Sequence, residues 1–164
     1  MDERLTPRLL DKTTIDRAFP LVRNLAPDIT LERWTRFAKP HLASRSPDWP
    51  RGLMTIQNAA GYILGLFVFE VRDDLYEKRV LCIDNIIIPN IPGRDAIWAG
   101  VVDAAEHIAA MNGCRTIRAG LADDLEPGAR DRDQTWLTGS LEKAGYSFEG
   151  MRAIKRLEAR HAAH

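Results

Sequence analysis

The sequence predicts a single α/β domain in which a mixed, mostly antiparallel sheet is flanked by helices. An apolar run rich in β-branched residues, Val80–Ile88, ends at Pro89 and is typical of a buried central strand. Apolar side chains then recur at helical spacing from Arg94 onward, and Gly113 provides a stop signal. At 164 residues the chain is long enough to bury one core.

The N-terminal part of the chain is expected to form one short strand and two helices. Leu5–Leu10 is a candidate first strand, and the apolar stripe of Thr14–Ala26 predicts a helix that Pro20 should break or kink. Thr30 is suited to cap a second helix, which ends near Pro40. The residues of this helix predicted to face inward are Leu31, Trp34, Phe37 and Ala38.

A hairpin is predicted between these helices and the central strand. The polar, proline-bearing segment His41–Gly52 is interpreted as a loop. Gly52–Asn58 and Tyr62–Val71 are predicted to be strands joined by a tight turn, with Gly65 marking a bulge or a close backbone approach. A second polar turn, Arg72–Lys78, leads into the central strand.

The chain beyond the long helix is expected to add a strand, a loop and a helix. Cys114–Leu121 is the predicted strand, and the charged segment Ala122–Asp133 is a loop of a length usually associated with function or mobility. The helix should run from Gln134 to Lys143, with Asp133 as its cap and Gly145 as its stop.

The last predicted strand is Phe148–Leu157. The domain is then expected to span residues 1–157, with a frayed tail over residues 158–164. The resulting order of elements, β-α-α-β-β-β-α-β-α-β, favours a mixed α/β sheet.

Composition narrows the classes of partner and compartment. Lys plus Arg and Asp plus Glu each number 23, so no basic excess points to a nucleic-acid partner. No apolar run is long enough to cross a membrane. Cys82 and Cys114 each fall in a predicted strand, so free thiols in a reducing, cytoplasmic compartment are expected. The histidines show no spacing with the cysteines that would form a metal site.

The strand, loop and helix of residues 80–113 form a candidate anion site. Such a unit directs the first N–H groups of its helix, and the positive end of the helix dipole, at one spot. That spot suits a phosphate or pyrophosphate group. Most units of this kind in α/β proteins bind nothing there, so a purely structural role is the alternative.

Three stretches resemble a known family. They are the run CIDNIIIP, the segment AGVVDAAEHIAAMNGCRTI, and Glu142-Lys143-Ala144-Gly145-Tyr146 near the end of the last helix. Together they resemble the acetyl-CoA-binding core of the GNAT superfamily of N-acetyltransferases. The resemblance implies a GNAT-like fold and an acyl-CoA-dependent N-acetyltransferase with acetyl-CoA as co-substrate.

The resemblance also implies where the donor would bind, with a degenerate pyrophosphate loop. Aligned on VVDAA, the chain has Gly93, Ala96 and Trp98 where relatives have Arg or Gln, Gly, and Gly or Ala. A shift of one or two residues would bring Gly93 and Arg94 into the phosphate cradle. The backbone of Ile86 and Ile88 would bind the acetyl carbonyl and the pantetheine arm.

In the family, a carboxylate on the central strand acts as general base, and Asp84 occupies such a place. An aspartate that caps a bulge or pairs with an arginine is the competing interpretation. Many relatives place a tyrosine acid in the last helix, where this chain has Leu141, so catalysis by proximity alone is an alternative.

The acceptor is expected to be a small-molecule or peptide amine. It would bind between the first two helices, the loop His41–Gly52 and the charged loop Ala122–Asp133, whose acidic residues suit a cation. Homodimerisation is a general expectation for such a chain. A catalytically inactive GNAT-fold binding or regulatory module is the alternative function.

Overall fold

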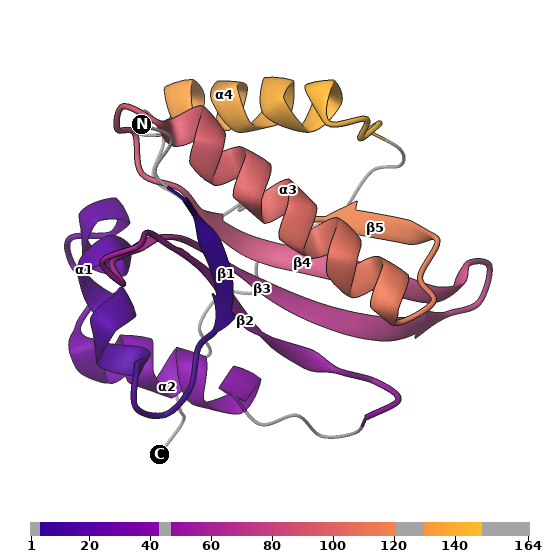
Figure 1. Ribbon diagram of the computed structural model, residues 1–164, viewed down its shortest axis with the longest axis horizontal. Helices are drawn as coiled ribbons and strands as arrows, with labels where there is room; N and C mark the ends of the chain where they lie inside the picture. Colours follow the sequence, from indigo (N-terminus) through magenta and orange to yellow (C-terminus); the bar gives the residue numbers. More distant parts are fainter. Residues whose placement is uncertain (1–3, 43–46, 121–129, 149–164) are drawn as a thin grey trace, which may run out of the picture.

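The computed structural model describes residues 4–42, 47–120 and 130–148. Within these ranges the elements follow the predicted order (Figure 1). They are β1 (Thr6–Leu9), α1 (Ile15–Leu25), α2 (Leu31–Leu42), β2 (Arg51–Gln57), β3 (Ile63–Asp74), β4 (Lys78–Ile87), α3 (Arg94–Met111), β5 (Thr116–Ala119) and α4 (Arg130–Lys143). The predicted last strand, apart from its first residue, and the predicted tail lie outside the described residues.

The described strands form one mixed sheet in the order β1-β2-β3-β4-β5. The pairs β1–β2, β2–β3 and β3–β4 are antiparallel, whereas β4–β5 is parallel, because α3 carries the chain back before β5 begins. The predicted fold class, a mixed and mostly antiparallel sheet flanked by helices, is therefore confirmed.

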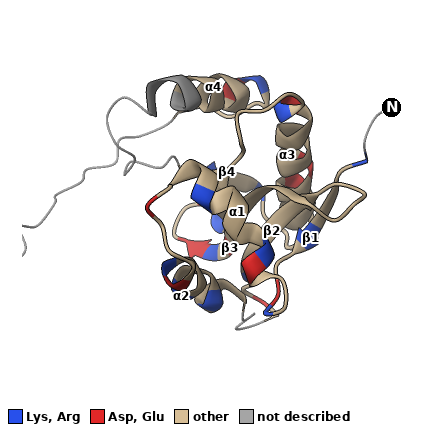
Figure 2. Cartoon of the chain, turned by 90° about the vertical axis from the view of Figure 1, so that its left-hand side faces the viewer, with Lys and Arg blue, Asp and Glu red and all other residues tan. Residues whose placement is uncertain are grey.

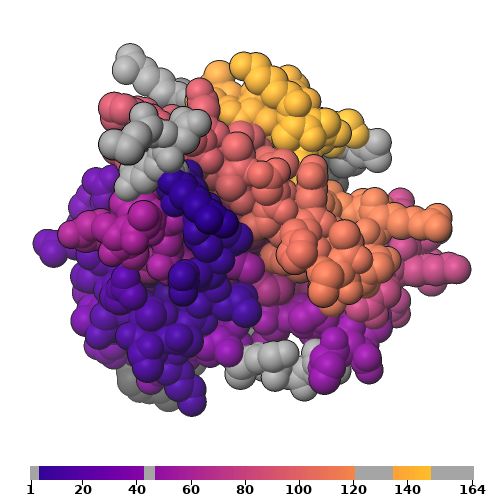
Figure 3. Space-filling view, viewed as in Figure 1, coloured from indigo at the N-terminus to yellow at the C-terminus, as the bar shows by residue number. Residues whose placement is uncertain are grey.

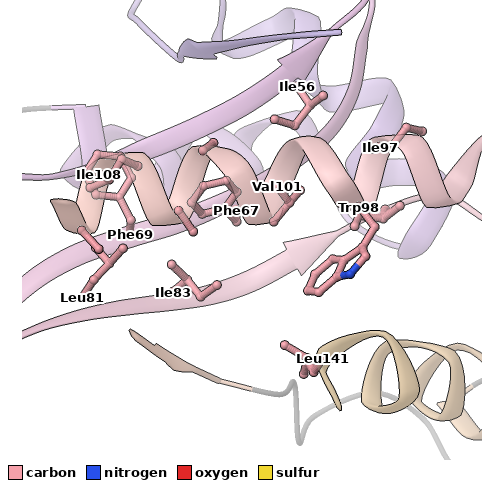
Figure 4. Packing of buried hydrophobic residues seen from close by; sticks show 14 of the residues in the cluster. Ile56, Phe67, Phe69, Leu81, Ile83, Ile97, Trp98, Val101, Ile108 and Leu141 are labelled. Carbon is pink, nitrogen blue, oxygen red and sulfur yellow. The ribbon is translucent and has the colours of Figure 1, made fainter. Parts of the chain in front are cut away.

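The larger core lies between the sheet and the pair α3 and α4. Apolar residues at helical spacing on α3 pack against alternate residues of β3 and β4 (Figure 4). These buried residues include Ile97, Trp98, Val101 and Ile108 of α3, Phe67 and Phe69 of β3, Leu81 and Ile83 of β4, and Leu141 of α4. In the space-filling view, α4 lies directly against α3 (Figure 3).

A second core lies on the opposite face of the sheet, under α1 and α2. Trp34 is 1% exposed, and its Nε1 donates a hydrogen bond of 2.9 Å to the carbonyl oxygen of Ile15, which ties α2 to α1. Leu53, Leu66 and Val68 of the sheet pack against these helices. As predicted, Thr30 caps α2, since its Oγ1 accepts a hydrogen bond from the N–H of Arg33 at 3.1 Å.

Three predictions about the helices were wrong in detail. Helix α1 continues through Pro20, so the predicted break does not occur, while the predicted kink stays a prediction. Buried Leu21 and Val22 hold the helix on the sheet although the proline supplies no N–H. Leu31 and Phe37 are exposed, so the inward face of α2 is narrower than predicted. Helix α4 begins at Arg130, which precludes Asp133 as its cap.

Gly65 sits at a close backbone approach, as the sequence predicted. A Cβ at this position would lie 2.8 Å from Cγ2 of Ile97 and 3.5 Å from the carbonyl oxygen of Ile87. The pairing of β2 with β3 is also irregular here, because Ile56 pairs with Gly65 and Gln57 with Ile63. The absence of a side chain at Gly65 thus lets the first turn of α3 come down onto β3.

Candidate active site

The site begins where the pairing of β4 with β5 ends within the described residues. Their parallel pairing runs from Val80 opposite Thr116 to Ile83 opposite Ala119, and the N–H of Gly120 donates to the carbonyl oxygen of Ile83 at 2.8 Å. Strand β4 then continues to Ile87. In the described part of the chain, the last residues of β4 pair only with β3. Beyond Ile83, one edge of β4 therefore has no neighbouring strand among the described residues.

A β-bulge marks the same point on β4. Asp84 pairs with Val68 and Ile87 pairs with Leu66, so β4 has one residue more than β3 between these two pairs. Asn85 lies in this bulge with a φ of 52°, in the left-handed region that asparagine tolerates better than most residues. The bulge separates the regular part of β4 from the segment that leads to α3.

The side chain of Asp84 lies over the end of β5. A Cβ added at Gly120 would overlap Oδ1 of Asp84 and lie 3.1 Å from its Cγ, so the missing side chain of Gly120 makes room for this carboxylate. Asp84 is half-buried, and within the described residues its carboxylate has no hydrogen-bond or ion-pair partner. The structure thus brings the predicted base to the point where the pairing of the two strands ends.

Two ion pairs lie on the same face of the sheet as Asp84. Nε and Nη2 of Arg72 are each 2.9 Å from Oε2 of Glu70, and Nη1 of Arg118 is 2.8 Å from Oδ2 of Asp74. The hydrogen bond to Glu70 raises the pKa of Arg72 above its usual value, and Asp84 adds to the same shift. Figure 2 shows basic and acidic segments side by side around β3 and α2.

Cys82 lies between these ion pairs. Burial raises the pKa of its thiol, and the charges of Arg72 and Arg118 act in the opposite direction. In the sheet register Cys82 is opposite Glu70 on one side and Arg118 on the other. The sequence analysis missed this charged surface. Its signal was the alternation of Glu70 and Arg72 with apolar residues along β3.

The start of α3 is a tight turn. The N–H of Arg94 donates to the carbonyl oxygen of Ile91 at 3.1 Å, and Gly93 has φ 86° and ψ 5°, as at the third position of a type II turn. The N–H groups of Ala96 and Ile97 both donate to the carbonyl oxygen of Gly93, at 3.0 and 3.2 Å. Three amides of this segment therefore have partners within the turn.

The space in front of Gly93 is open, since a Cβ there would meet nothing within 4 Å. Gly93 immediately precedes α3, Arg94 is its first residue and Ala96 its third. The structure thus brings these three predicted donor-binding residues together at the helix N-terminus. Asp95 in the same turn adds a negative charge.

Arg94 contacts both α4 and the loop that precedes α3, whereas Trp98 faces α4. Cζ of Arg94 lies 3.7 Å from the ring centroid of Trp136, and Nη1 is 3.4 Å from Oδ1 of Asn90. Trp98 is 8% exposed and meets Trp136 edge to face at 6.2 Å. Figure 4 shows its indole directed toward Leu141. Trp98 therefore fills the seam between α3 and α4 and stays clear of the open space at Gly93.

The other predicted residues have mixed positions. Ile86, which lies in the bulge, is half-buried against the larger core, and Ile88, which follows β4, is buried within that core. Leu141 is 1% exposed in the same core, so α4 supplies no proton donor at that position. Of the two loops predicted to border the acceptor, residues 43–46 and 121–129 lie outside the described residues.

A cavity of about 170 Å³ lies beside the end of β4 and was not predicted. It is lined by Leu21, Asn24 and Leu25 of α1 and by residues 87–90. Among the described residues, no group of three His, Cys, Asp or Glu side chains is placed to hold a metal ion. In the same part of the chain, no helix has the length and apolarity needed to span a membrane.

Solved structures of N-acetyltransferases resemble this chain over nearly its whole length. An aminoglycoside N-acetyltransferase, AAC(6')-Iy, in complex with CoA matches with a TM-score of 0.69 at 15% identity, covering 97% of each chain. A ribosomal-protein-alanine N-acetyltransferase from Brucella melitensis biovar Abortus 2308 matches with a TM-score of 0.69 at 14% identity, covering 94% of this chain and 100% of the other. Glucosamine-6-phosphate N-acetyltransferase from Arabidopsis thaliana matches with a TM-score of 0.65 at 15% identity, covering 95% of this chain and 100% of the other.

No family model matches the sequence, and no curated protein matches it. At these identities the structural likeness establishes the fold.

Proposed function

From the GNAT fold that this chain shares with solved N-acetyltransferases, we propose that it is an acyl-CoA-dependent N-acetyltransferase acting on a small-molecule or peptide amine. One observation carries the proposal. The half-buried carboxylate of Asp84, with no partner among the described residues, lies where the pairing of β4 with β5 ends. A carboxylate in this position is available to the ammonium group of an acceptor.

The residues at the start of α3 fit the donor. Gly93 leaves open space in front of the helix, and the helix dipole and the charge of Arg94 both favour a pyrophosphate there. Cζ of Arg94 lies 3.7 Å from the ring centroid of Trp136, which holds its charge at the start of α3. The cradle proposed here therefore uses an arginine side chain where relatives use backbone amides.

When bound, acetyl-CoA supplies an acetyl group activated as a thioester. We assign its arm to the backbone of Ile86 and Ile88, at the end of β4 and just beyond it, where β4 has no second neighbouring strand in the described ranges. Asp84 would attract the acceptor as a cation and then take a proton from its nitrogen, which gives a neutral amine. Held beside the acyl group, the amine would form the amide bond as the thioester C–S bond breaks, with proximity supplying the acceleration. The departing CoA thiolate would take its proton from water, because Leu141 provides no acid.

A second function, a catalytically inactive binding or regulatory module, is favoured by one specific observation. The amides of Arg94, Ala96 and Ile97 are all hydrogen-bonded within the turn and are not directed at a ligand. A module of this kind would keep the fold and its α3–α4 seam without transferring an acyl group.

A transfer assay separates the two functions. Release of the CoA thiol is measured with acetyl-CoA and a panel of amines for the wild type, Asp84→Asn and Asp103→Asn. Asp103 is an exposed aspartate on α3 and serves as the matched control. We expect turnover with at least one amine, a loss of about 100-fold or more in Asp84→Asn, and no change in Asp103→Asn. Equal activity of wild type and Asp84→Asn would refute the assigned base.

The two free thiols are consistent with a reducing compartment, and we propose that the reaction takes place in the cytoplasm.

A further inference from the structure

Asp84 lies on a charged face of the sheet. The sheet face that carries it also carries Arg72 and Arg118, and a carboxylate beside a guanidinium ordinarily forms an ion pair. Asp84 nevertheless has no such partner in the described ranges. Each arginine is instead bonded to a different carboxylate, Glu70 or Asp74.

The register of the sheet places Arg72 and Asp84 on one face, with Glu70 between them. Arg72 is opposite Val80, Glu70 is opposite Cys82, and Val68 is opposite Asp84, so Glu70 is one step along this face from the Asp84 pair and Arg72 is two steps from it. Two residues along a strand correspond to about 7 Å. The charge of Asp84 also contributes to the raised pKa of Arg72, whereas it is not among the groups that raise the pKa of Arg118. Arg118, opposite Cys82, is held by Asp74 at 2.8 Å. Arg72 is the other arginine of this face, and it is held by Glu70, which lies between Arg72 and Asp84.

We propose that Glu70 is a positioning residue, whose ion pair with Arg72 keeps the guanidinium away from Asp84 and so leaves this carboxylate available to the acceptor. This inference rests on the proposed function, because it assigns to Glu70 a purpose in the same reaction. Nε and Nη2 of Arg72 both contact the same oxygen of Glu70, so the ion pair holds the guanidinium at Glu70.

A surface ion pair of this type contributes little to the stability of the fold. Arg72 and Glu70 have side-chain exposures of 55% and 38%, and exposed pairs typically contribute less than about 1 kcal/mol to stability. If stability were the only role, removing Glu70 would resemble removing any other exposed partner of an arginine. The pair of Glu32 and Arg36 on α2, also at 2.9 Å, offers that comparison.

The test is a double-mutant cycle in the transfer assay. We expect Glu70→Ala to lower kcat/KM for the amine by about tenfold or more, because Arg72 moves to Asp84 and competes with the acceptor. Arg72→Met should stay within about threefold of the wild type, and Glu70→Ala/Arg72→Met should recover to the same level. The matched control, Glu32→Ala, should not change kcat/KM. A double variant as impaired as Glu70→Ala would overturn the proposal.

A second measurement does not depend on activity. Crystal structures of the wild type and Glu70→Ala should show Arg72 at ion-pair distance from Asp84 in the variant only. If the wild type transfers no acyl group but Arg72 moves as expected, the proposed function fails while the role of Glu70 in keeping Asp84 unpaired stands. An Arg72 that stays away from Asp84 in Glu70→Ala would refute this role even in an active enzyme.

Discussion

Gly120→Ala should separate catalysis from stability. The backbone of Gly120 is outside the left-handed region, so alanine meets no backbone strain there. Its Cβ would overlap Oδ1 of Asp84, which must move by more than about 1 Å, and a displacement of that size in a reacting group costs about 100-fold in rate. Asp84 can rotate away at a cost of about 0.5–1.5 kcal/mol, partly offset by the lower entropy of the unfolded chain.

We therefore expect Gly120→Ala to lose about 100-fold in kcat/KM while its free energy of unfolding changes by less than about 1 kcal/mol. The assays are acetyl transfer and urea unfolding. Gly139→Ala in α4 is the matched control, because its Cβ meets nothing within 4 Å. This control should gain about 0.5–1 kcal/mol and keep full activity. Wild-type activity in Gly120→Ala would refute the assignment of Asp84, as would a large loss of stability without a change in rate.

Three further predictions concern stability and reactivity. Gly65→Ala should destabilise the fold by about 1–3 kcal/mol in urea unfolding, because its Cβ would lie 2.8 Å from Ile97, and an unchanged midpoint would contradict the close approach described above. Burial raises the pKa of the Cys82 thiol, so Cys82 should react with a disulfide reagent at neutral pH far more slowly in the native protein than in urea. Cys82→Ser identifies the reaction of this thiol, because the slow phase of the native protein should be missing from the variant. The hydrogen bond from the N–H of Glu77 lowers the pKa of Asp74 in the folded state. The contribution of the Asp74 carboxylate to stability is therefore present above about pH 4 and is lost as the pH falls through the lowered pKa. The difference in unfolding free energy between wild type and Asp74→Asn should shrink over that pH range.

The sequence predicted the elements whose patterns are local. The period of the apolar residues placed the long helix at Arg94–Gly113, and the structure has it at Arg94–Met111 with Gly113 in the left-handed region. The start of α4 was missed because the first helical residues, 130–133, are all charged and give no apolar period. Pro20 does not end α1 as the sequence suggested, because the packing of its buried neighbours outweighs the missing N–H.

The candidate site was predictable only in part. Asp84, Gly93 and Arg94 could be named because the strand and the helix that carry them resemble the acetyl-CoA-binding core of the GNAT superfamily. The ion pair of Glu70 with Arg72 and the space over Gly120 could not, because both depend on the register between strands far apart in the chain. The direction of Trp98 likewise depends on where α4 packs, which no local pattern specifies.

Isothermal titration with acetyl-CoA tests most directly whether the start of α3 binds the donor. It uses the wild type, Arg94→Glu and, as a matched control, Arg36→Glu at an exposed position of α2. We expect micromolar binding by the wild type and by the control, weakened by about tenfold or more in Arg94→Glu. No heat with the wild type, and no thermal shift at millimolar ligand, would contradict the proposed binding of acetyl-CoA and favour a catalytically inactive binding module.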